Sequence, residues 1–197
     1  MTFTCPIEIV QLLVSPSHAY FGRSKDGPAA DVRTQLPSSV EVVTGKGIRG
    51  DRFFGVQAHT EAAITFLAVE AWETAVAEAN ALHPDDEPWD GDVSVARRNI
   101  VVRGLELDPL RGEDFVIDTG DGPVLLRGGR PAHPCAWMDS MVVDGTRKAL
   151  IGRGGLRTAP ISSGTLRVGH GVVISPVPLD PERAALSVRR AQPLPRG

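Results

Sequence analysis

Residues 115–127 have the sequence FVIDTGDGPVLLR. Two apolar segments, Phe115–Asp118 and Val124–Arg127, flank Thr119-Gly120-Asp121-Gly122, and Asp-Gly pairs of this kind are typical of a hairpin turn. Branched and aromatic residues that are bounded by turn residues indicate strands. This stretch therefore predicts a β-hairpin, and the chain from Asn99 onward has the same alternation of short apolar segments and turn residues.

Similar short apolar segments occur on both sides of the hairpin. The other expected strands are Ile7–Val14, Val40–Val43, Ala62–Leu67, Ile100–Arg103, Leu156–Ala159, Thr165–Val168 and Val172–Ser175. Many short strands at this spacing favour a barrel or a sandwich.

The clearest expected helix runs from Val69 to Asn80, because Val69, Trp72, Val76 and Ala79 fall on one face at helical spacing. A short helix is also expected after Cys135, around Ala136–Met141 or Arg147–Ile151. Helices are few compared with strands, so the chain is expected to be mainly β.

The C-terminal residues 176–197 are rich in proline and arginine. We expect them to form a surface tail after a single domain of residues 1–175. Within the tail, residues 181–190 are compatible with one helical piece.

Composition limits the function classes. The 197 residues are 42% hydrophobic and 23% charged, which suits one domain with a real core. A net charge of −3 gives no overall attraction to nucleic acid or to an anionic membrane. The first residues lack the pattern of a signal peptide, and no segment has the length of a membrane span. With only two cysteines, we expect a cytoplasmic location and no iron–sulfur cluster.

Gly45-Lys46-Gly47-Ile48-Arg49-Gly50 matches the G-x-G-x-x-G pattern of dinucleotide-binding sites. That site needs a helix that opens at the glycines. Here Asp51-Arg52-Phe53-Phe54-Gly55 follows and then another strand, so we do not expect a nucleotide fold. Asp51 and Arg52 are expected to pair with each other or with a ligand, or to form a turn in which Asp51 caps backbone amides. Gly152-Arg153-Gly154-Gly155 has a similar ambiguity between an anion-binding nest and a plain turn.

Cys135 ends the segment Arg130-Pro131-Ala132-His133-Pro134-Cys135, where two prolines restrict the backbone. We expect a loop that presents the thiol. Arg130 and His133 are close enough in sequence to favour the thiolate, which is the form that attacks or binds a metal. The alternative is a small core residue, since free cysteine is often buried.

Other polar groups give weaker signals. Arg97-Arg98-Asn99 precedes a strand, so one arginine is expected to face a site and the other solvent, or both to flank an edge strand. No pair of histidines has zinc-site spacing, and a serine-hydrolase G-x-S-x-G motif is absent from the sequence. The histidines of most interest are His59 and His133.

Together these pieces resemble the MOSC domain, the family named for the C-terminal domain of molybdenum cofactor sulfurase. The resemblance covers about residues 7–175. The matching segments, in the family's order, are Ser15-Pro16 to Tyr20-Phe21-Gly22-Arg23; Gly47 to Gly55; Ala63 to Leu67 with Glu70; Arg98-Asn99-Ile100-Val101-Val102 with Gly104, Leu107, Leu110 and Gly112; Pro134-Cys135; Gly152 to Gly155; and Gly169-His170-Gly171.

The resemblance implies an α+β, mainly β fold: a MOSC-type β-barrel, similar to the pyruvate-kinase β-barrel, with a few peripheral helices. It implies binding of the molybdenum cofactor, a pyranopterin with a dithiolene and a phosphate, and it makes Cys135 the protein ligand to molybdenum. The residues expected to bind the pterin or its phosphate are Arg98, Asn99, Arg130, Arg52 and Arg23. His133 would gate protons.

The expected function is that of an oxidoreductase that reduces N-hydroxylated compounds, with electrons from a separate flavin or heme protein. We expect neither the family's aminotransferase-like sulfurase domain in these 197 residues nor its C-terminal helical extension, unless residues 181–190 are a remnant of that extension. One alternative is a carrier that holds a persulfide or the cofactor on Cys135 and delivers it to a client molybdoenzyme. A third is a degenerate binding domain in which Cys135 is dispensable.

Overall fold

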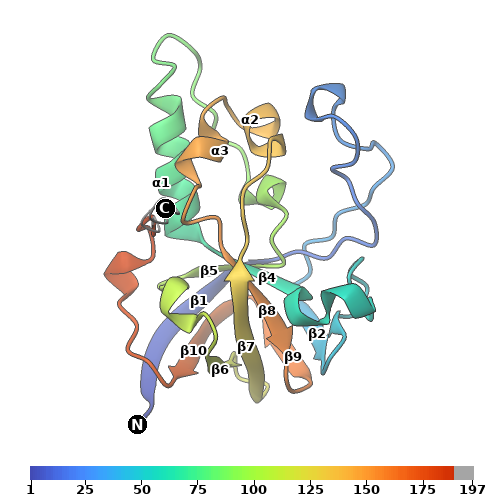
Figure 1. Ribbon diagram of the computed structural model, residues 1–197, viewed down its shortest axis with the longest axis vertical. Helices are drawn as coiled ribbons and strands as arrows, with labels where there is room; N and C mark the ends of the chain where they lie inside the picture. The colour runs from blue at the N-terminus through green and yellow to red at the C-terminus, as the bar shows by residue number, and fades with distance from the viewer. Residues whose placement is uncertain (189–197) are drawn as a thin grey trace, which may run out of the picture.

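The computed structural model describes residues 1–188, and within them seven strands close into a barrel (Figure 1). In barrel order the strands are β1 (Phe3–Leu12), β10 (Gly169–Ser175), β6 (Asp114–Asp118), β7 (Pro123–Pro131), β8 (Leu156–Pro160), β4 (Ile64–Ala68) and β5 (Ile100–Arg103). β4 and β5 pair in parallel, and the other neighbours pair antiparallel. A small sheet of β3 (Gly47–Ile48), β2 (Ser39–Val43) and β9 (Gly164–Arg167) lies beside the barrel.

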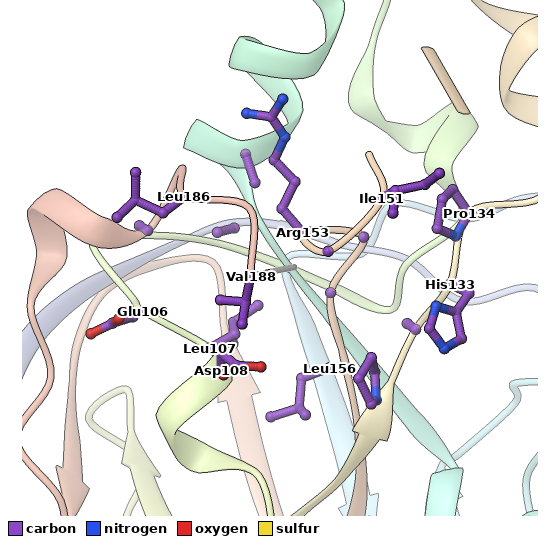
Figure 2. Close-up of a pocket in the computed structure, with 18 of the residues that line it drawn as sticks. Glu106, Leu107, Asp108, His133, Pro134, Ile151, Arg153, Leu156, Leu186 and Val188 are labelled. Atoms are coloured by element: carbon purple, nitrogen blue, oxygen red, sulfur yellow. The ribbon is translucent and has the colours of Figure 1, made fainter. Parts of the chain in front are cut away.

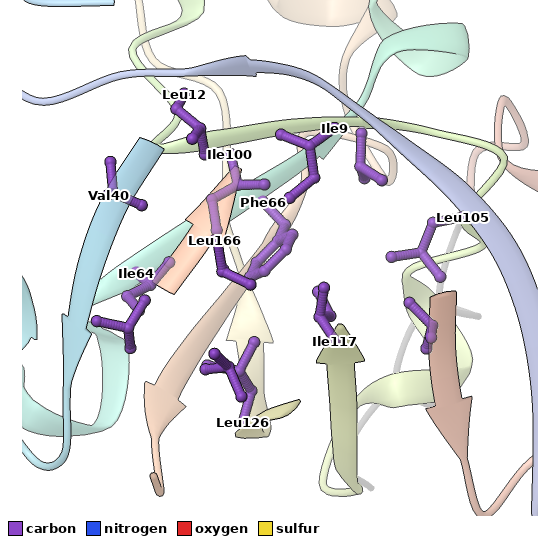
Figure 3. Packing of buried hydrophobic residues seen from close by; sticks show 14 of the residues in the cluster. Ile9, Leu12, Val40, Ile64, Phe66, Ile100, Leu105, Ile117, Leu126 and Leu166 are labelled. Atoms are coloured by element: carbon purple, nitrogen blue, oxygen red, sulfur yellow. The ribbon is translucent and has the colours of Figure 1, made fainter. Parts of the chain in front are cut away.

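The barrel is filled by the inward-facing residues of each strand. In the predicted hairpin, Phe115 pairs with Leu126 and Ile117 pairs with Val124, and all four side chains are buried. Phe66 of β4 meets Phe115 edge to face at 6.2 Å between ring centroids. Burying each side chain of this size contributes about 1.5–3 kcal/mol. Figure 3 shows Phe66, Ile117 and Leu126 among the packed apolar side chains between the strands.

The helices gather at the end of the barrel that β7 points toward (Figure 1). They are α1 (Val69–Asn80), α2 (Trp137–Met141) and α3 (Thr146–Ala149). A second apolar cluster joins them to the barrel through Leu67, Trp72, Trp137, Met138 and Leu150. The 3₁₀ helices are Ser24–Asp26, Gln57–Ala62, Val93–Ala96, Asp108–Leu110 and Pro181–Arg183. None of the described helices is long and apolar enough to cross a membrane.

The main elements agree with the sequence predictions. The hairpin is formed by β6 and β7, α1 has the predicted bounds, and both short helices after Cys135 are present. One difference concerns β7, which extends to Pro131, so that Arg130 and Pro131 end a strand and do not begin the loop. The pairing with β8 shifts register between Gly128 and Pro131. A bulge of this kind lets proline enter a strand end.

The last described residues, 176–188, pack against the barrel. Val177 and Leu179 contact the main core and Ala184 is buried. The Arg183 guanidinium binds the Glu106 carboxylate at 2.8 Å. Of the helical piece predicted over 181–190, only the turn Pro181–Arg183 is present among the described residues, and positions 189 and 190 lie outside them.

Candidate functional site

Cys135 lies between the end of β7 and the start of α2, at the same end of the barrel as the helices. Its thiol is free and the residue is exposed, whereas Cys5, the other cysteine, is buried in β1. The alternative of a small core residue is therefore wrong for Cys135. The backbone carbonyl of Cys135 accepts a hydrogen bond from Met138 N at 3.0 Å, so the first turn of α2 fixes the position of the cysteine.

Arginine side chains gather beside this thiol. Burial lowers the pKa of Arg98 to about 10, and the neighbouring Arg157 and Arg52 lower it too, while Cys135 acts to raise it. Burial and then Arg52 also lower the pKa of Arg97. A pKa of about 10 still leaves Arg98 charged at neutral pH. The site is thus a cluster of close guanidinium groups with one exposed thiol at its edge; below we call Arg52, Arg97, Arg98 and Arg157 the arginine cluster.

Two members of the arginine cluster carry buried donors that have no protein partner. Nε and Nη1 of Arg52 and Nε of Arg157 are buried and make no hydrogen bond to the described residues. The carboxylate closest to Arg52 is that of Asp51, at 3.6 Å from Nη1. An unpartnered buried donor costs about 1–3 kcal/mol. An anion that accepted these hydrogen bonds would recover that cost, so the arrangement favours anion binding.

Asp51 combines the two roles that its sequence position left open. Its Oδ1 accepts a hydrogen bond from Phe53 N at 3.1 Å, as in a turn, and its Oδ2 accepts one from Ser15 N at 3.3 Å. The same carboxylate lies beside Arg52. Because Asp51 is buried and held from several sides, it fixes where the Arg52 side chain leaves the backbone.

Asn99, a predicted cofactor-binding residue, lies behind Asp51. Its Nδ2 donates to Asp51 Oδ2 at 3.1 Å and to Leu13 O at 3.2 Å. Its Oδ1 accepts from the backbone N and the hydroxyl of Thr65. These four bonds use the whole capacity of the amide. Asn99 therefore acts in this conformation as a link that positions Asp51, and has no free group for a ligand.

Arg97 and Arg98 reach the site in a way that the sequence did not predict. They precede β5, so the expected alternation across a strand is wrong for them. Arg97 has a left-handed backbone with φ of 53° at the end of the 3₁₀ helix Val93–Ala96. Its guanidinium donates to the hydroxyls of Ser15 and Thr34, at 2.6 and 2.8 Å.

Arg98 is held by backbone carbonyls. Its Nε donates to Gly154 O at 3.1 Å and its Nη1 to Ala96 O at 2.8 Å. No carboxylate of the described residues forms an ion pair with it. The positive charge of Arg98 is thus oriented by the protein without being neutralised.

Aromatic side chains complete the site, and sequence reasoning did not assign them a role. Tyr20 stacks on Trp137 at 4.7 Å with an interplanar angle of 6°, and its hydroxyl donates to Val95 O at 2.6 Å. Burial raises the pKa of Tyr20 to about 12. The stack ties the early loop to the first residue of α2, next to Cys135. The only sequence signal for a role of Tyr20 was its position in residues 15–23, a segment that resembles the early loop of the MOSC family.

A second aromatic group lies next to Arg52. The Arg52 guanidinium lies over the Phe53 ring at 4.5 Å, and Phe53 contacts both His18 and His59. Burial lowers the pKa of His18, and the positive charges of Arg52 and Arg97 lower it further. His59 was singled out from the sequence, whereas His18 was not.

The remaining predicted residues lie at the margin. Arg130 is exposed at the end of β7. Burial lowers the pKa of Arg157, and the positive charge of the nearby Arg130 lowers it further. His133 is exposed on the loop before Cys135. Arg23 is exposed just before the 3₁₀ helix Ser24–Asp26, and its side chain makes no hydrogen bond to residues 1–188.

Neither glycine-rich segment opens a helix. Gly45 lies in the turn between β2 and β3, Gly47 begins β3, and Gly50 lies in the turn that follows it. At Gly155 a Cβ atom would lie 2.0 Å from Phe66 O, and at Gly154 it would lie 2.5 Å from Ala132 O. These glycines are therefore required for close packing of the backbone, which explains them without a ligand.

The sequence matches no family model and no curated protein. Solved structures do share the fold. The YuaD protein from Bacillus subtilis superposes with a TM-score of 0.64 at 14% identity, over 89% of this chain and 98% of that one. YiiM from Geobacillus stearothermophilus gives 0.54 at 17% identity, over 85% and 74%. YiiM from Escherichia coli gives 0.53 at 15% identity, over 93% and 76%. These are MOSC-type proteins, and the predicted fold class is confirmed: the chain has a MOSC-like β-barrel.

Proposed function

We propose that this chain belongs to the MOSC family, binds the molybdenum cofactor and reduces N-hydroxylated compounds. The observation that carries the proposal is the exposed Cys135 thiol beside the arginine cluster, whose buried donors on Arg52 and Arg157 have no partner. The MOSC-like fold supports it, because the resemblance of the sequence motifs and the likeness of the structures point to the same family.

The donor set of the site fits the cofactor. A thiolate is a soft ligand and suits a sulfur-rich metal site. Arginine forks suit a phosphate group, and Arg52, Arg98, Arg157 and Arg130 are the candidates to hold it. Among the described residues no three His, Cys, Asp or Glu side chains are grouped as metal ligands. A metal bound through Cys135 would therefore take its other ligands from a cofactor, as the dithiolene would provide.

When bound, the cofactor would supply two-electron redox chemistry. Reduction of an N-hydroxyl group consumes two electrons and two protons, breaks the N–O bond and releases water. The electrons would come from a separate flavin or heme protein. The chain's own residues would orient the anionic cofactor through the arginine cluster, hold Cys135 at the start of α2, and supply protons through His18, His59 or the predicted His133.

The test is the molybdenum and pterin content per chain, after production with molybdate supplied and the cofactor pathway intact. We expect both in the wild type, and loss of metal from Cys135→Ala. Cys5→Ala is the matched control, because Cys5 is buried in β1 and is expected to leave the content unchanged. A wild-type protein with neither metal nor pterin, or equal content in both cysteine variants, would contradict the proposal.

The exposure of Cys135 also favours a second candidate, a carrier that delivers sulfur or cofactor to a client molybdoenzyme. An exposed thiol can be reached by another protein, whereas a reductase needs access only for a small substrate. The carrier predicts sulfane sulfur on Cys135 and little turnover. Assays of hydroxylamine-type substrates with a reducing dye, beside cyanide-released sulfur from wild type and Cys135→Ala, separate the two.

A further inference from the structure

A pocket of about 790 Å³ lies next to the arginine cluster but is built from other residues (Figure 2). Its walls are the end of β7, the loop Gly152–Gly155, the turn around Asp108 and the last described residues, 183–188. Pockets that bind small molecules have about 300–1,000 Å³. The size is therefore that of a binding site for an organic molecule.

The pocket and the arginine cluster meet at Gly154. The carbonyl of Gly154 accepts the hydrogen bond from Arg98, while the residue also lines the pocket. Cys135, Arg52 and Arg98 do not line it. The pocket thus lies beside the arginine cluster, and Arg130, His133 and Pro134 of the segment before Cys135 line it.

Much of the lining is apolar. Leu156 is buried and Leu107 is partly buried, whereas Ile151, Leu186 and Val188 are exposed, and all five line the pocket (Figure 2). Ala68, at the end of β4, and Ala71, in α1, leave space because their side chains are small. Such a lining favours a ligand with an apolar body.

The charges around this lining are mainly positive. Glu106 is bound by Arg183 and Asp108 by Arg111, so both acidic groups are neutralised. Arg153 pairs with Glu78, outside the pocket. Arg130 and Lys148 have no ion-pair partner among the described residues. The ion pairs thus leave two cations unneutralised.

Arg111 also lines the pocket. Its Nε is buried and makes no hydrogen bond to the described residues, although its Nη1 binds Asp108 at 3.2 Å. A carboxylate that accepted this hydrogen bond would satisfy a donor that is otherwise unpaired.

We propose that this pocket binds an organic carboxylate with an apolar body, such as a medium-chain or aryl carboxylic acid. The apolar lining takes the body, and Arg111 and Lys148 attract the carboxylate. The proposal concerns a site beside the arginine cluster, and the variants that test it change Lys148 and Ile151, to which the proposed function assigns no role.

The test is calorimetric titration of the full chain with octanoate and with octan-1-ol, which share the apolar chain and differ in charge. We expect octanoate to bind at least about tenfold more tightly, which corresponds to about 1.4 kcal/mol. Lys148→Gln should weaken octanoate several-fold, and Arg147→Gln, its neighbour on α3 that does not line the pocket, should not.

A second pair of variants tests the location. Ile151 is 53% exposed at the opening, so Ile151→Trp fills the pocket without disturbing the core and should abolish binding. Val168→Trp, also at an exposed apolar position but away from the pocket, should not. Equal affinity for the alcohol, or no binding of either compound, would overturn the proposal. So would octanoate binding that survives Ile151→Trp and is lost in Arg52→Gln, because the anion would then occupy the arginine cluster.

Discussion

The interior of the barrel is buried and the arginine cluster at its end is partly buried, and the two are built in opposite ways. Inside the barrel, Phe66, Phe115 and their neighbours are apolar side chains that pack against each other. In the arginine cluster, Arg52 and Arg157 keep buried donors without partners, and the charge of Arg98 is not neutralised. The difference indicates that the interior serves stability, while the cluster is retained at a cost to stability and suits an anionic ligand.

The largest expected effect belongs to the interior. Phe66 is fully buried in β4 and contacts Phe115, so Phe66→Ala should leave a cavity and lower the free energy of unfolding by about 3–5 kcal/mol. Ile174→Ala, at a partly exposed position on β10, is the control and should cost much less. Urea unfolding followed by far-UV circular dichroism measures both. Equal losses would mean that the barrel is not held by its interior.

The link between the two regions should be the next most sensitive. Asn99→Asp places a second carboxylate about where Nδ2 now donates to Asp51 Oδ2 at 3.1 Å. Two adjacent carboxylates repel each other, so each raises the pKa of the other. The folded variant then binds more protons than the unfolded chain, so its stability should rise as the pH falls. We expect a loss of about 2–3 kcal/mol at pH 8 that is smaller at pH 5.

The measurement for Asn99→Asp is urea unfolding at pH 5 and pH 8, relative to the wild type at each pH. Asn99→Ala is the control, because it removes the same hydrogen bonds without adding a charge and should show little additional pH dependence. A loss in Asn99→Asp that did not change with pH would mean that Asp51 and position 99 are not coupled.

The two regions also differ in what the sequence could predict. Short apolar segments and the face of Val69–Asn80 predicted the barrel strands and α1, because burial patterns are local. The stack of Tyr20 on Trp137 joins distant segments, and no local pattern encodes it. The alternation expected for Arg97 and Arg98 fails because both precede β5 and Arg97 has a left-handed backbone. Asn99 was expected at a ligand because the family resemblance implied it, whereas the four hydrogen bonds of its side chain lie within the protein. The candidate role of Cys135 came from the family resemblance and its proline-containing loop.

Within the arginine cluster, removing a charge should cost less stability than a substitution in the interior, and much ligand binding. Arg52→Met keeps the volume and removes the buried donors that make no hydrogen bond, but it also removes the cation beside the buried Asp51 carboxylate. Because Ser15, Phe53 and Asn99 still donate hydrogen bonds to Asp51, the loss in the free energy of unfolding should stay below the loss of about 3–5 kcal/mol that a fully broken buried ion pair causes. Phosphate should stabilise the wild type through binding to the folded state and should not stabilise Arg52→Met.

Arg49→Met is the matched control for Arg52→Met. Arg49 lies in the same glycine-rich segment but is exposed and pairs with Glu41, so its loss should change stability little and leave the phosphate effect intact. Thermal unfolding with and without phosphate measures the effect. A large destabilisation by Arg52→Met would make Arg52 a structural residue and weaken the contrast between the regions.

The smallest expected effect is a change in the titration of His18. Its pKa is lowered first by burial and then by Arg52 and Arg97, so Arg52→Gln should raise it, while Arg49→Gln should not. Because the folded chain binds the His18 proton less readily than the unfolded chain, His18 supports stability above its ordinary pKa of about 6.5 and loses that support as the pH falls below it.

An anion bound to the arginine cluster should act like the Arg52 substitution, since it offsets the same positive charge. Histidine resonances followed by NMR between pH 4 and 8, with and without phosphate, measure this. A pKa of His18 that ignored both phosphate and Arg52→Gln would mean that the cluster does not act as one anion site.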